Sequence, residues 1–168
     1  MKQDPVNFWM QMERLERLIR AAELKAGLIF SFHSLILGLF FDRLDALQDT
    51  FQNSIIFIIL VSLWILFGSI SIYYSIKCFI PRIELKYKKN VFFFKDAINS
   101  FGTIEEFSKQ YMDVCKNEKE LFKYLSQQIH IESKIIDAKF GCVQKSIKFL
   151  AVTFVFVVLI LVYWLLLL

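Results

Sequence analysis

Three long runs without a charged residue constrain what this chain of 168 residues can fold into. The runs cover residues 26–41, 50–76 and 149–168. A helix needs about 20 apolar residues to cross a bilayer core, with about 17 as the lower limit. The second and third runs meet this length, and the first meets it if flanking charged side chains reach back to the membrane surfaces. The sequence therefore predicts an all-α membrane protein with about three transmembrane helices, and two spans plus an interfacial helix is the alternative.

The distribution of charge orients these spans. Residues 1–25 carry five basic and four acidic side chains, residues 42–53 one Arg and three Asp, and residues 77–148 fourteen basic and nine acidic side chains. Because basic residues are enriched in cytoplasmic segments, we expect a cytoplasmic N-terminus and an acidic loop outside. The predicted parts are a cytoplasmic amphipathic helix (4–25), two transmembrane helices (26–44 and 54–80), a cytoplasmic sensing section (81–146) and a third transmembrane helix (147–168).

The N-terminal segment has a heptad pattern. Asp4 and Pro5 are typical of a helix start, and no further Gly or Pro occurs before Gly27. Apolar residues recur at alternating spacings of four and three residues: Phe8, Met12, Leu15, Ile19, Ala22 and Ala26. This spacing predicts one amphipathic heptad helix that is continuous with the first span. Its apolar seam either associates with a second copy or packs on the middle section of its own chain.

The first span contains an ionisable residue, His33, on the face that continues this seam. Such a side chain in a membrane usually faces the interior of a helix bundle or water. A separate stripe of small residues allows helices to approach closely: Gly27, Ser31, Ser34 and Gly38. We predict a pore-lining or oligomer face made of Leu15, Ile19, Ala26, Ser31, His33 and Ser34. The alternatives are ordinary helix packing and a neutral His33 that is hydrogen-bonded to a neighbouring backbone group.

The second span is expected to be capped by Asp49 or Thr50 and to end at Pro81. Alternating apolar and charged residues then predict an extended segment over 83–88. Cations and aromatic side chains follow one another in this stretch: Lys86, Lys88, Lys89, Phe92 and Phe93. This combination suits a nucleotide or single-stranded oligonucleotide, because phosphates need neutralisation and bases stack on aromatic rings. It equally suits a segment that lies against anionic lipid headgroups.

The remaining chain predicts a short helix and a very long one. Thr103 and Glu106 form a capping-box pattern that opens a helix to about Cys115. Residues 118–168 contain no Pro and a single Gly, Gly141, so that one helix can run for roughly 75 Å. We expect this long C-terminal helix to be continuous with the last span, with a kink possible at Gly141 or near Lys148.

No catalytic or metal-binding pattern occurs in the sequence. His33 and His130 are far apart, and Cys78, Cys115 and Cys142 do not have the spacing of metal ligands. Gly-rich phosphate loops and hydrolase or kinase signatures are absent from the sequence. We therefore expect a protein that is not an enzyme and that holds neither a metal nor a cofactor.

The order of several short motifs resembles the Pycsar-effector family of small bacterial membrane proteins. The matching motifs are Glu23 to Ala26, Pro81, Asn90 to Asp96, Phe107 to Tyr111, Gln128 to Ile135, and Lys139 with Phe140. The resemblance implies a homo-oligomeric effector of anti-phage defence in the bacterial inner membrane. It also implies a signal, a cyclic nucleotide or short oligonucleotide, made by a neighbouring nucleotide cyclase or nucleotidyltransferase.

Under this resemblance we predict a ligand-binding surface on the cytoplasmic section. Its residues are Lys86, Lys88, Lys89, Asn90, Phe92, Phe93, Gln128, His130, Lys134 and Lys139. Three spans cannot enclose an aqueous pore, so that conduction requires several copies around an axis. The ligand either opens this assembly or holds it closed. Two other classes remain open: a ligand-independent holin-like pore-former or toxin, and a membrane scaffold that recruits a soluble partner.

Overall fold

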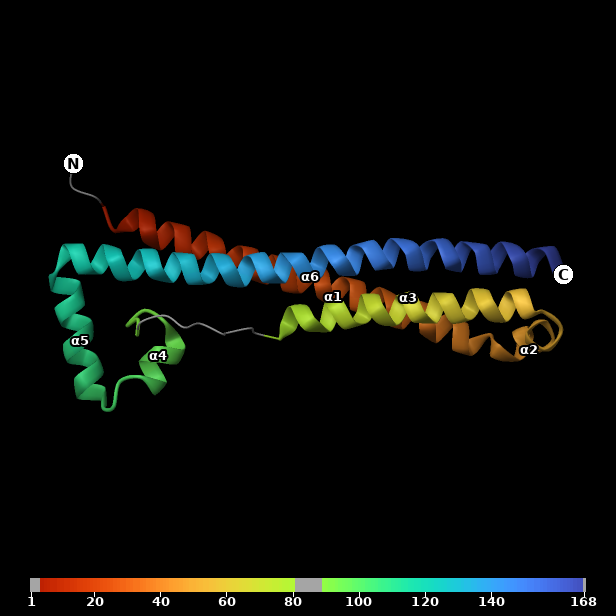
Figure 1. Cartoon of the computed structure of the whole chain (residues 1–168), viewed down its shortest axis with the longest axis horizontal. Helices are drawn as coiled ribbons and strands as arrows, with labels where there is room; N and C mark the ends of the chain where they lie inside the picture. The colour runs from red at the N-terminus through yellow and green to blue at the C-terminus, as the bar shows by residue number, and fades with distance from the viewer. Residues whose placement is uncertain (1–3, 81–88, 168) are drawn as a thin grey trace. The chain divides into compact units, whose positions relative to one another are not determined.

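The computed structural model describes residues 4–80 and 89–167, and about 90% of these residues are helical, with no strand among them. The helices are α1 (Val6–Asp42), α2 (Leu44–Asn53), α3 (Ile55–Phe79), α4 (Phe94–Asn99), α5 (Ile104–Lys116) and α6 (Glu118–Leu167), as labelled in Figure 1. α1, α3 and α6 are each long and apolar enough to cross a membrane. The predicted all-α membrane protein with three spans is thus confirmed. The predicted extended segment over 83–88 lies outside the described residues.

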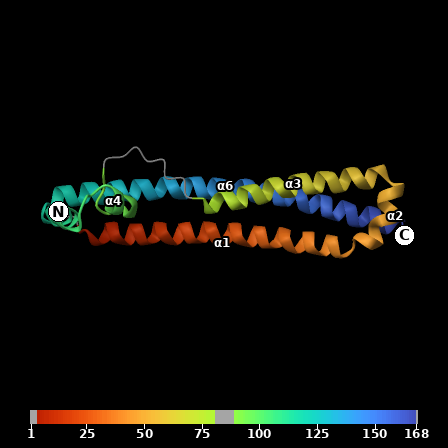
Figure 2. The ribbon, with the colours of Figure 1, turned by 90° about the horizontal axis from the view of Figure 1, so that it is seen from below.

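The described residues form two compact units. Unit 1 contains residues 4–20 and 89–137, and unit 2 contains residues 21–80 and 138–167. α2 and α3 belong to unit 2, and α4 and α5 belong to unit 1. α1 and α6 contribute residues to both units, and each is one uninterrupted helix (Figure 2). The predicted long N-terminal and C-terminal helices are therefore present, and α6 continues through Gly141 and Lys148.

The apolar seam of α1 is covered by the chain itself. α1 begins after Asp4, whose Oδ1 accepts a hydrogen bond from the Val6 N–H at 3.0 Å. Along the seam, Leu15, Ala22 and Ala26 are buried, whereas Phe8, Met12 and Ile19 are half-buried. The Phe8 ring lies 5.2 Å from the Phe122 ring of α6, centroid to centroid. The structure thus favours the second reading of the heptad pattern, in which the seam packs within its own chain.

The segment between the first two spans is helical. The prediction of a loop over 42–53, with Asp49 or Thr50 capping the second span, is wrong: α2 occupies this segment, and Ser54 caps α3. The Ser54 Oγ accepts a hydrogen bond from the Phe57 N–H at 3.2 Å and bonds the Tyr163 hydroxyl at 2.7 Å. The physical reason is amphipathicity: Leu47 joins a buried cluster with Phe57, Val61, Trp64 and Ile160.

α3 and α6 are joined by a cluster of buried hydroxyl groups in unit 2. Ser71, Ser75 and Ser146 are all fully buried. The Ser146 Oγ donates to the Ser71 carbonyl at 2.8 Å and lies 2.7 Å from the Ser75 Oγ. The Ser71 Oγ in turn donates to the Ser146 carbonyl at 2.9 Å. Small polar residues allow membrane helices to approach closely and to bond across the contact, so that this serine cluster fixes the position of α6 on α3.

His33 lies in the interior of unit 2. Its Nδ1 donates to the Ile29 carbonyl at 3.0 Å, and its ring packs beside Gly68 of α3 and Thr153 of α6. By contrast, Ser31 and Ser34 are exposed on α1. The residues predicted to form one pore or oligomer face therefore divide between the covered side of α1 and its exposed side.

Gly68→Ala is expected to be tolerated. An added Cβ would lie 3.6 Å from the His33 Cδ2 and 3.7 Å from the Thr153 Cγ2, which are ordinary contacts. Because alanine also restricts the unfolded chain, we expect an unchanged or slightly higher unfolding temperature in detergent. Gly68→Leu should lower this temperature by several degrees, since its side chain would displace His33. A loss of stability in Gly68→Ala equal to that in Gly68→Leu would contradict this packing.

The capping box that opens α5 is confirmed. The Thr103 Oγ1 accepts from the Glu106 N–H at 3.2 Å, and the Glu106 Oε2 accepts from the Thr103 N–H at 3.3 Å. α5 ends at Lys116, close to the predicted end. Asn117 then caps α6, because its Oδ1 accepts from the Glu120 N–H at 3.4 Å. These caps define where the chain of unit 1 turns from α5 into α6.

Candidate ligand-binding groove

Unit 1 contains a groove of about 460 Å³, here called the α1–α6 groove. It is lined by Trp9, Met12, Glu13, Glu16 and Ile19 of α1, by Phe92, Phe93 and Phe94, and by Gln128, Glu132 and Ile135 of α6. Its volume lies within the range of about 300–1,000 Å³ that is usual for small-molecule sites. Three residues of the predicted ligand-binding surface, Phe92, Phe93 and Gln128, meet here.

Aromatic side chains form the walls of the groove. The Trp9 and Phe92 rings lie 5.6 Å apart, centroid to centroid, and are nearly perpendicular at 86°. Phe93 is buried and lies 5.2 Å from the Phe94 ring. These rings offer both flat faces and edges to a planar ligand.

Asn90 positions the aromatic segment. It is fully buried, and its Nδ2 donates to the Tyr124 carbonyl of α6 at 2.9 Å. Its Oδ1 accepts from the Phe92 N–H, and its own N–H donates to the Asp96 Oδ2, both at 2.9 Å. These side-chain and backbone bonds determine where the chain enters the groove. Asn90 was predicted as a ligand contact, and the structure gives its polar groups partners within the chain.

Two of the polar side chains of the groove, Gln128 and Glu132, lie on one face of α6. The Gln128 Nε2 donates to the Glu132 Oε1 at 3.0 Å, one helical turn away. The other two acceptor atoms of the pair, the Gln128 Oε1 and the Glu132 Oε2, are buried and have no hydrogen-bond partner among the described residues. A buried acceptor without a partner costs about 1–3 kcal/mol. Both atoms are enclosed by the protein, so that they lack a hydrogen-bond partner in this arrangement of the described helices.

The Glu132 carboxyl is harder to ionise than an ordinary glutamate. It precedes the charge-free run 149–168 and lies outside the apolar part of α6. Burial raises the pKa of Glu132, and the nearby Glu16 carboxylate raises it further, whereas the Gln128 hydrogen bond lowers it. The protonation state of this carboxyl therefore changes at higher pH than that of an exposed glutamate.

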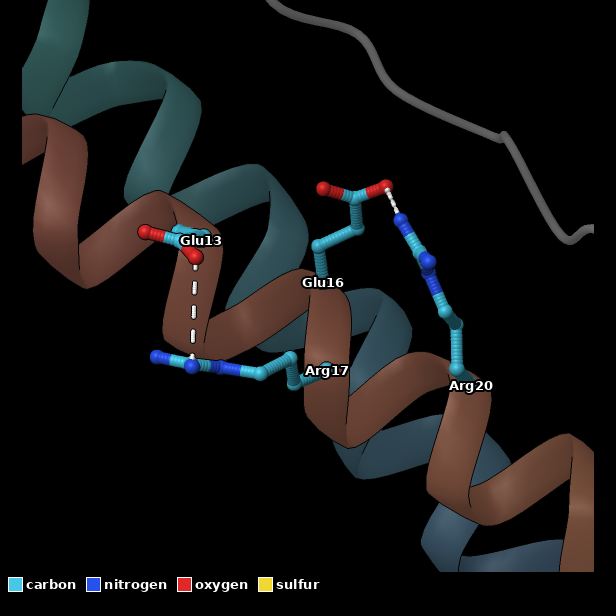
Figure 3. Close-up of polar contacts among 4 residues, drawn as sticks. All are labelled: Glu13, Glu16, Arg17 and Arg20. Carbon is cyan, nitrogen blue, oxygen red and sulfur yellow. Dashed lines mark hydrogen bonds and ion pairs between the residues drawn. The ribbon is translucent and has the colours of Figure 1, made fainter.

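Two ion pairs border the groove on α1 (Figure 3). Arg17 lies 3.8 Å from Glu13, and Arg20 bonds Glu16, each pair spanning one helical turn. All four side chains are exposed. Among the described residues that line the groove, none is basic. The described lining therefore offers carboxylates, an amide and aromatic rings, and Glu13 and Glu16 are each paired with an arginine.

Other predicted ligand contacts lie elsewhere in unit 1. The Lys89 Nζ donates to the Ser100 carbonyl at 2.8 Å and lines a second cavity, of about 580 Å³, with α5. His130 and Lys134 are exposed and point away from the groove, about 200° and 240° around α6 from Gln128. Lys86 and Lys88 lie outside the described residues.

Lys139 is buried in unit 2 and is bound to two groups of its own chain. Its Nζ donates to the Glu23 Oε1 of α1 and to the Cys78 carbonyl of α3, both at 2.7 Å. The ammonium group thus joins all three long helices. Lys139 belongs to unit 2, whereas the groove residues Phe92, Phe93 and Gln128 belong to unit 1.

Sequence reasoning did not select Trp9, Glu16 or Glu132 as site residues. The four-residue spacing of Gln128 and Glu132 indicates a shared helix face, but Trp9 carries no comparable signal. Among the described residues, no three His, Cys, Asp or Glu side chains come together as potential metal ligands.

Comparison with known proteins gives one assignment. No curated protein and no solved structure matches the chain. The model of the Pycsar effector protein domain, PycTM, matches residues 7–166. This match covers nearly the whole chain and includes α3, most of α1 and all but the last residue of α6. The protein therefore belongs to the Pycsar effector family of transmembrane anti-phage effectors.

Proposed function

We propose that this protein is a homo-oligomeric effector of the bacterial inner membrane that forms a pore under the control of a nucleotide or oligonucleotide signal. The signal is made by a nucleotide cyclase or nucleotidyltransferase that is encoded by a neighbouring gene. The observation that carries ligand control is the α1–α6 groove, in which the polar side chains of Gln128 and Glu132 share the lining with aromatic walls. Aromatic surfaces for stacking, combined with a few polar side chains, are what a nucleotide base requires.

The helices that carry the groove also carry the membrane spans. Trp9 and Glu16 lie on α1 and Gln128 lies on α6, and both helices continue without a break into their charge-free runs. A ligand that binds one arrangement of these helices more tightly than another shifts the population between them. The groove can thereby control the membrane segments without any separate connecting domain.

The pore requires several copies of the chain, because three helices cannot enclose a water-filled channel. In this proposal the copies meet through the exposed side of α1, where Ser31, Ser34 and Gly38 are accessible. Small side chains at such spacing allow close contact between membrane helices. In this proposal the N-terminus and the section 81–146 lie in the cytoplasm, where the signal is made.

Trp9→Ala is expected to weaken nucleotide control about ten- to hundredfold, since a base that stacks on an aromatic ring gains about 1–3 kcal/mol. The experiment measures dye release from proteoliposomes against the concentration of added cyclic nucleotides or trinucleotides. Met10→Ala is the matched control, because Met10 is an exposed apolar residue of α1 that does not line the groove. Its concentration dependence should equal that of the unmodified protein.

Each other outcome of this assay identifies a different class of protein. Dye release that no nucleotide changes would favour a ligand-independent, holin-like pore-former. Absence of release under every condition would favour a membrane scaffold. Equal responses of Trp9→Ala and Met10→Ala would place the ligand outside the α1–α6 groove.

A further inference from the structure

We propose that unit 2 binds an anionic phospholipid at the Tyr74 ring, where Lys77 of α3 and Lys145 of α6 together hold the phosphate of the lipid headgroup. These three residues are here called the lysine–tyrosine site. The inference goes beyond the proposed function and does not depend on nucleotide control. It requires only that α3 and α6 span a bilayer, for which both helices are long and apolar enough.

Two ammonium groups from different helices gather at this one ring. The Lys77 Nζ lies 5.8 Å from the centre of the Tyr74 ring, and the Lys145 Nζ lies 5.4 Å from it. The Lys77 Nζ also donates to the Tyr73 hydroxyl at 3.5 Å, and that hydroxyl can donate its own proton to a phosphate oxygen. Lysine side chains are long and flexible, so that both ammonium groups can reach one anionic group beside the ring.

The charge around the site is positive on both helices. α3 contains no acidic residue, and α6 contains none after Asp137. Neither Lys77 nor Lys145 lies within ion-pair distance of a carboxylate on any residue that the structure describes. At the same end of unit 2, the Glu23 carboxylate is already bonded to Lys139. A phosphate therefore supplies the negative charge that the described part of the protein does not provide at this site.

The site lies at the boundary between the membrane spans and the charged part of the chain. Lys77 is the first charged residue after the charge-free run 50–76, and Lys145 lies four residues before the run 149–168. At this boundary of a bilayer, tyrosine rings are enriched and lysine side chains extend toward the surface. The lysine–tyrosine site is therefore at the depth at which lipid phosphates are found.

Nearly parallel aromatic rings continue from Tyr74 into the apolar part of both helices. The Phe149 ring lies 6.0 Å from the Tyr74 ring and 6.3 Å from the Phe67 ring, centroid to centroid, and the Phe156 ring lies 5.5 Å from Phe67. All four rings are half-buried, so that part of each remains accessible. An acyl chain attached to the headgroup can lie along these rings for about 10 Å, the two helical turns from Tyr74 to Phe67.

The test is lipid binding by the full-length protein in detergent, measured by native mass spectrometry. The probes are phosphatidylglycerol, which is anionic, and phosphatidylcholine with the same acyl chains, which has no net charge. One lysine near a membrane surface increases the affinity for an anionic lipid about fivefold. With two lysines at the site, we expect phosphatidylglycerol to bind about ten- to hundredfold more tightly than phosphatidylcholine.

Variants of the two lysines locate the binding. Lys77→Gln and Lys145→Gln should each reduce the preference for phosphatidylglycerol about fivefold, and the double variant should reduce it to less than about threefold. Lys77→Arg combined with Lys145→Arg keeps both charges and should keep the preference. Lys25→Gln is the matched control, because it removes one charge at the same end of unit 2, where the Lys25 Nζ lies 5.7 Å from the centre of a different ring, Phe140. Its preference should stay within about twofold of that of the unmodified protein.

Three outcomes would overturn this inference. The first is equal binding of the two lipids, and the second is an equal loss of preference in Lys25→Gln and Lys77→Gln, which would show attraction by overall charge alone. The third is displacement of phosphatidylglycerol by inorganic phosphate at the concentration of the lipid, which would show a site for soluble anions. Nucleotide control is tested separately by dye release, so that each of these outcomes leaves the proposed function standing.

Discussion

Lys139→Met is expected to lower the free energy of unfolding in detergent by about 2–3 kcal/mol and the unfolding temperature by about 4–12 °C. The Lys139 Nζ donates hydrogen bonds to the Glu23 carboxylate and to the Cys78 carbonyl, both at 2.7 Å. α3 ends at Phe79, so that the Cys78 carbonyl is one of the last carbonyls of the helix and has no partner in its own helix. Without Lys139, this carbonyl and the Glu23 carboxylate lose their partner. The effect is smaller than for a fully buried pair because Glu23 is 37% exposed.

Lys145→Met is the matched control for this prediction. Lys145 also lies on α6, but it is exposed, and its Nζ stands 5.4 Å from the centre of the Tyr74 ring. An exposed cation–π contact contributes about 0.5–1 kcal/mol. The double variant Glu23→Gln with Lys139→Met should recover part of the loss, because it removes the unpaired carboxylate. Equal unfolding temperatures for Lys139→Met and Lys145→Met would show that the ammonium group does not join the helices.

Ser146→Leu is expected to disrupt the contact between α3 and α6, with a loss of about 3 kcal/mol or more. Ser71, Ser75 and Ser146 are fully buried, so that a leucine has no space between the helices. Overpacking costs about 1–3 kcal/mol, and each interhelical hydrogen bond in a membrane contributes about 0.6 kcal/mol on average. The measurement is the fraction of monodisperse protein after heating in detergent.

Ser146→Ala makes this prediction testable even if the leucine variant does not fold. The alanine removes the hydroxyl that bonds Ser71 and Ser75 but keeps the carbonyl that accepts from the Ser71 Oγ. We expect an intermediate loss of about 1–2 kcal/mol. Gln144→Leu, at an exposed position of the same helix, should have no effect. A Ser146→Leu protein as stable as Gln144→Leu would contradict the packing of the serine cluster.

The long helices could be predicted from the sequence because their signals are local. Charge-free runs and the scarcity of Gly and Pro identify α1, α3 and α6, and Thr103 with Glu106 locates the start of α5. α2 was missed because five of its ten residues have charged or amide side chains and Leu47 is the one that is buried, so that the segment has the composition of a loop. A short amphipathic helix of this kind depends on the core it covers.

The groove could be predicted only in part. Phe92, Phe93 and Gln128 were selected on composition and on the resemblance, and the structure brings them together. Trp9 reaches the same groove from more than 80 residues away, so that no spacing in the sequence reveals the contact. Lys139 was predicted as a ligand contact under the resemblance, and only the positions of Glu23 and Cys78 explain its burial.

The ion pair of Lys139 also limits how this family can diverge. Its two members are 116 positions apart in the chain, yet a change in either leaves the other without a charged partner. We expect lineages that replace the lysine to have replaced Glu23 as well, by a neutral residue or by an exchange of the two charges. Family members in which only one of the two residues is replaced should be rare, because a protein with a single replacement is less stable.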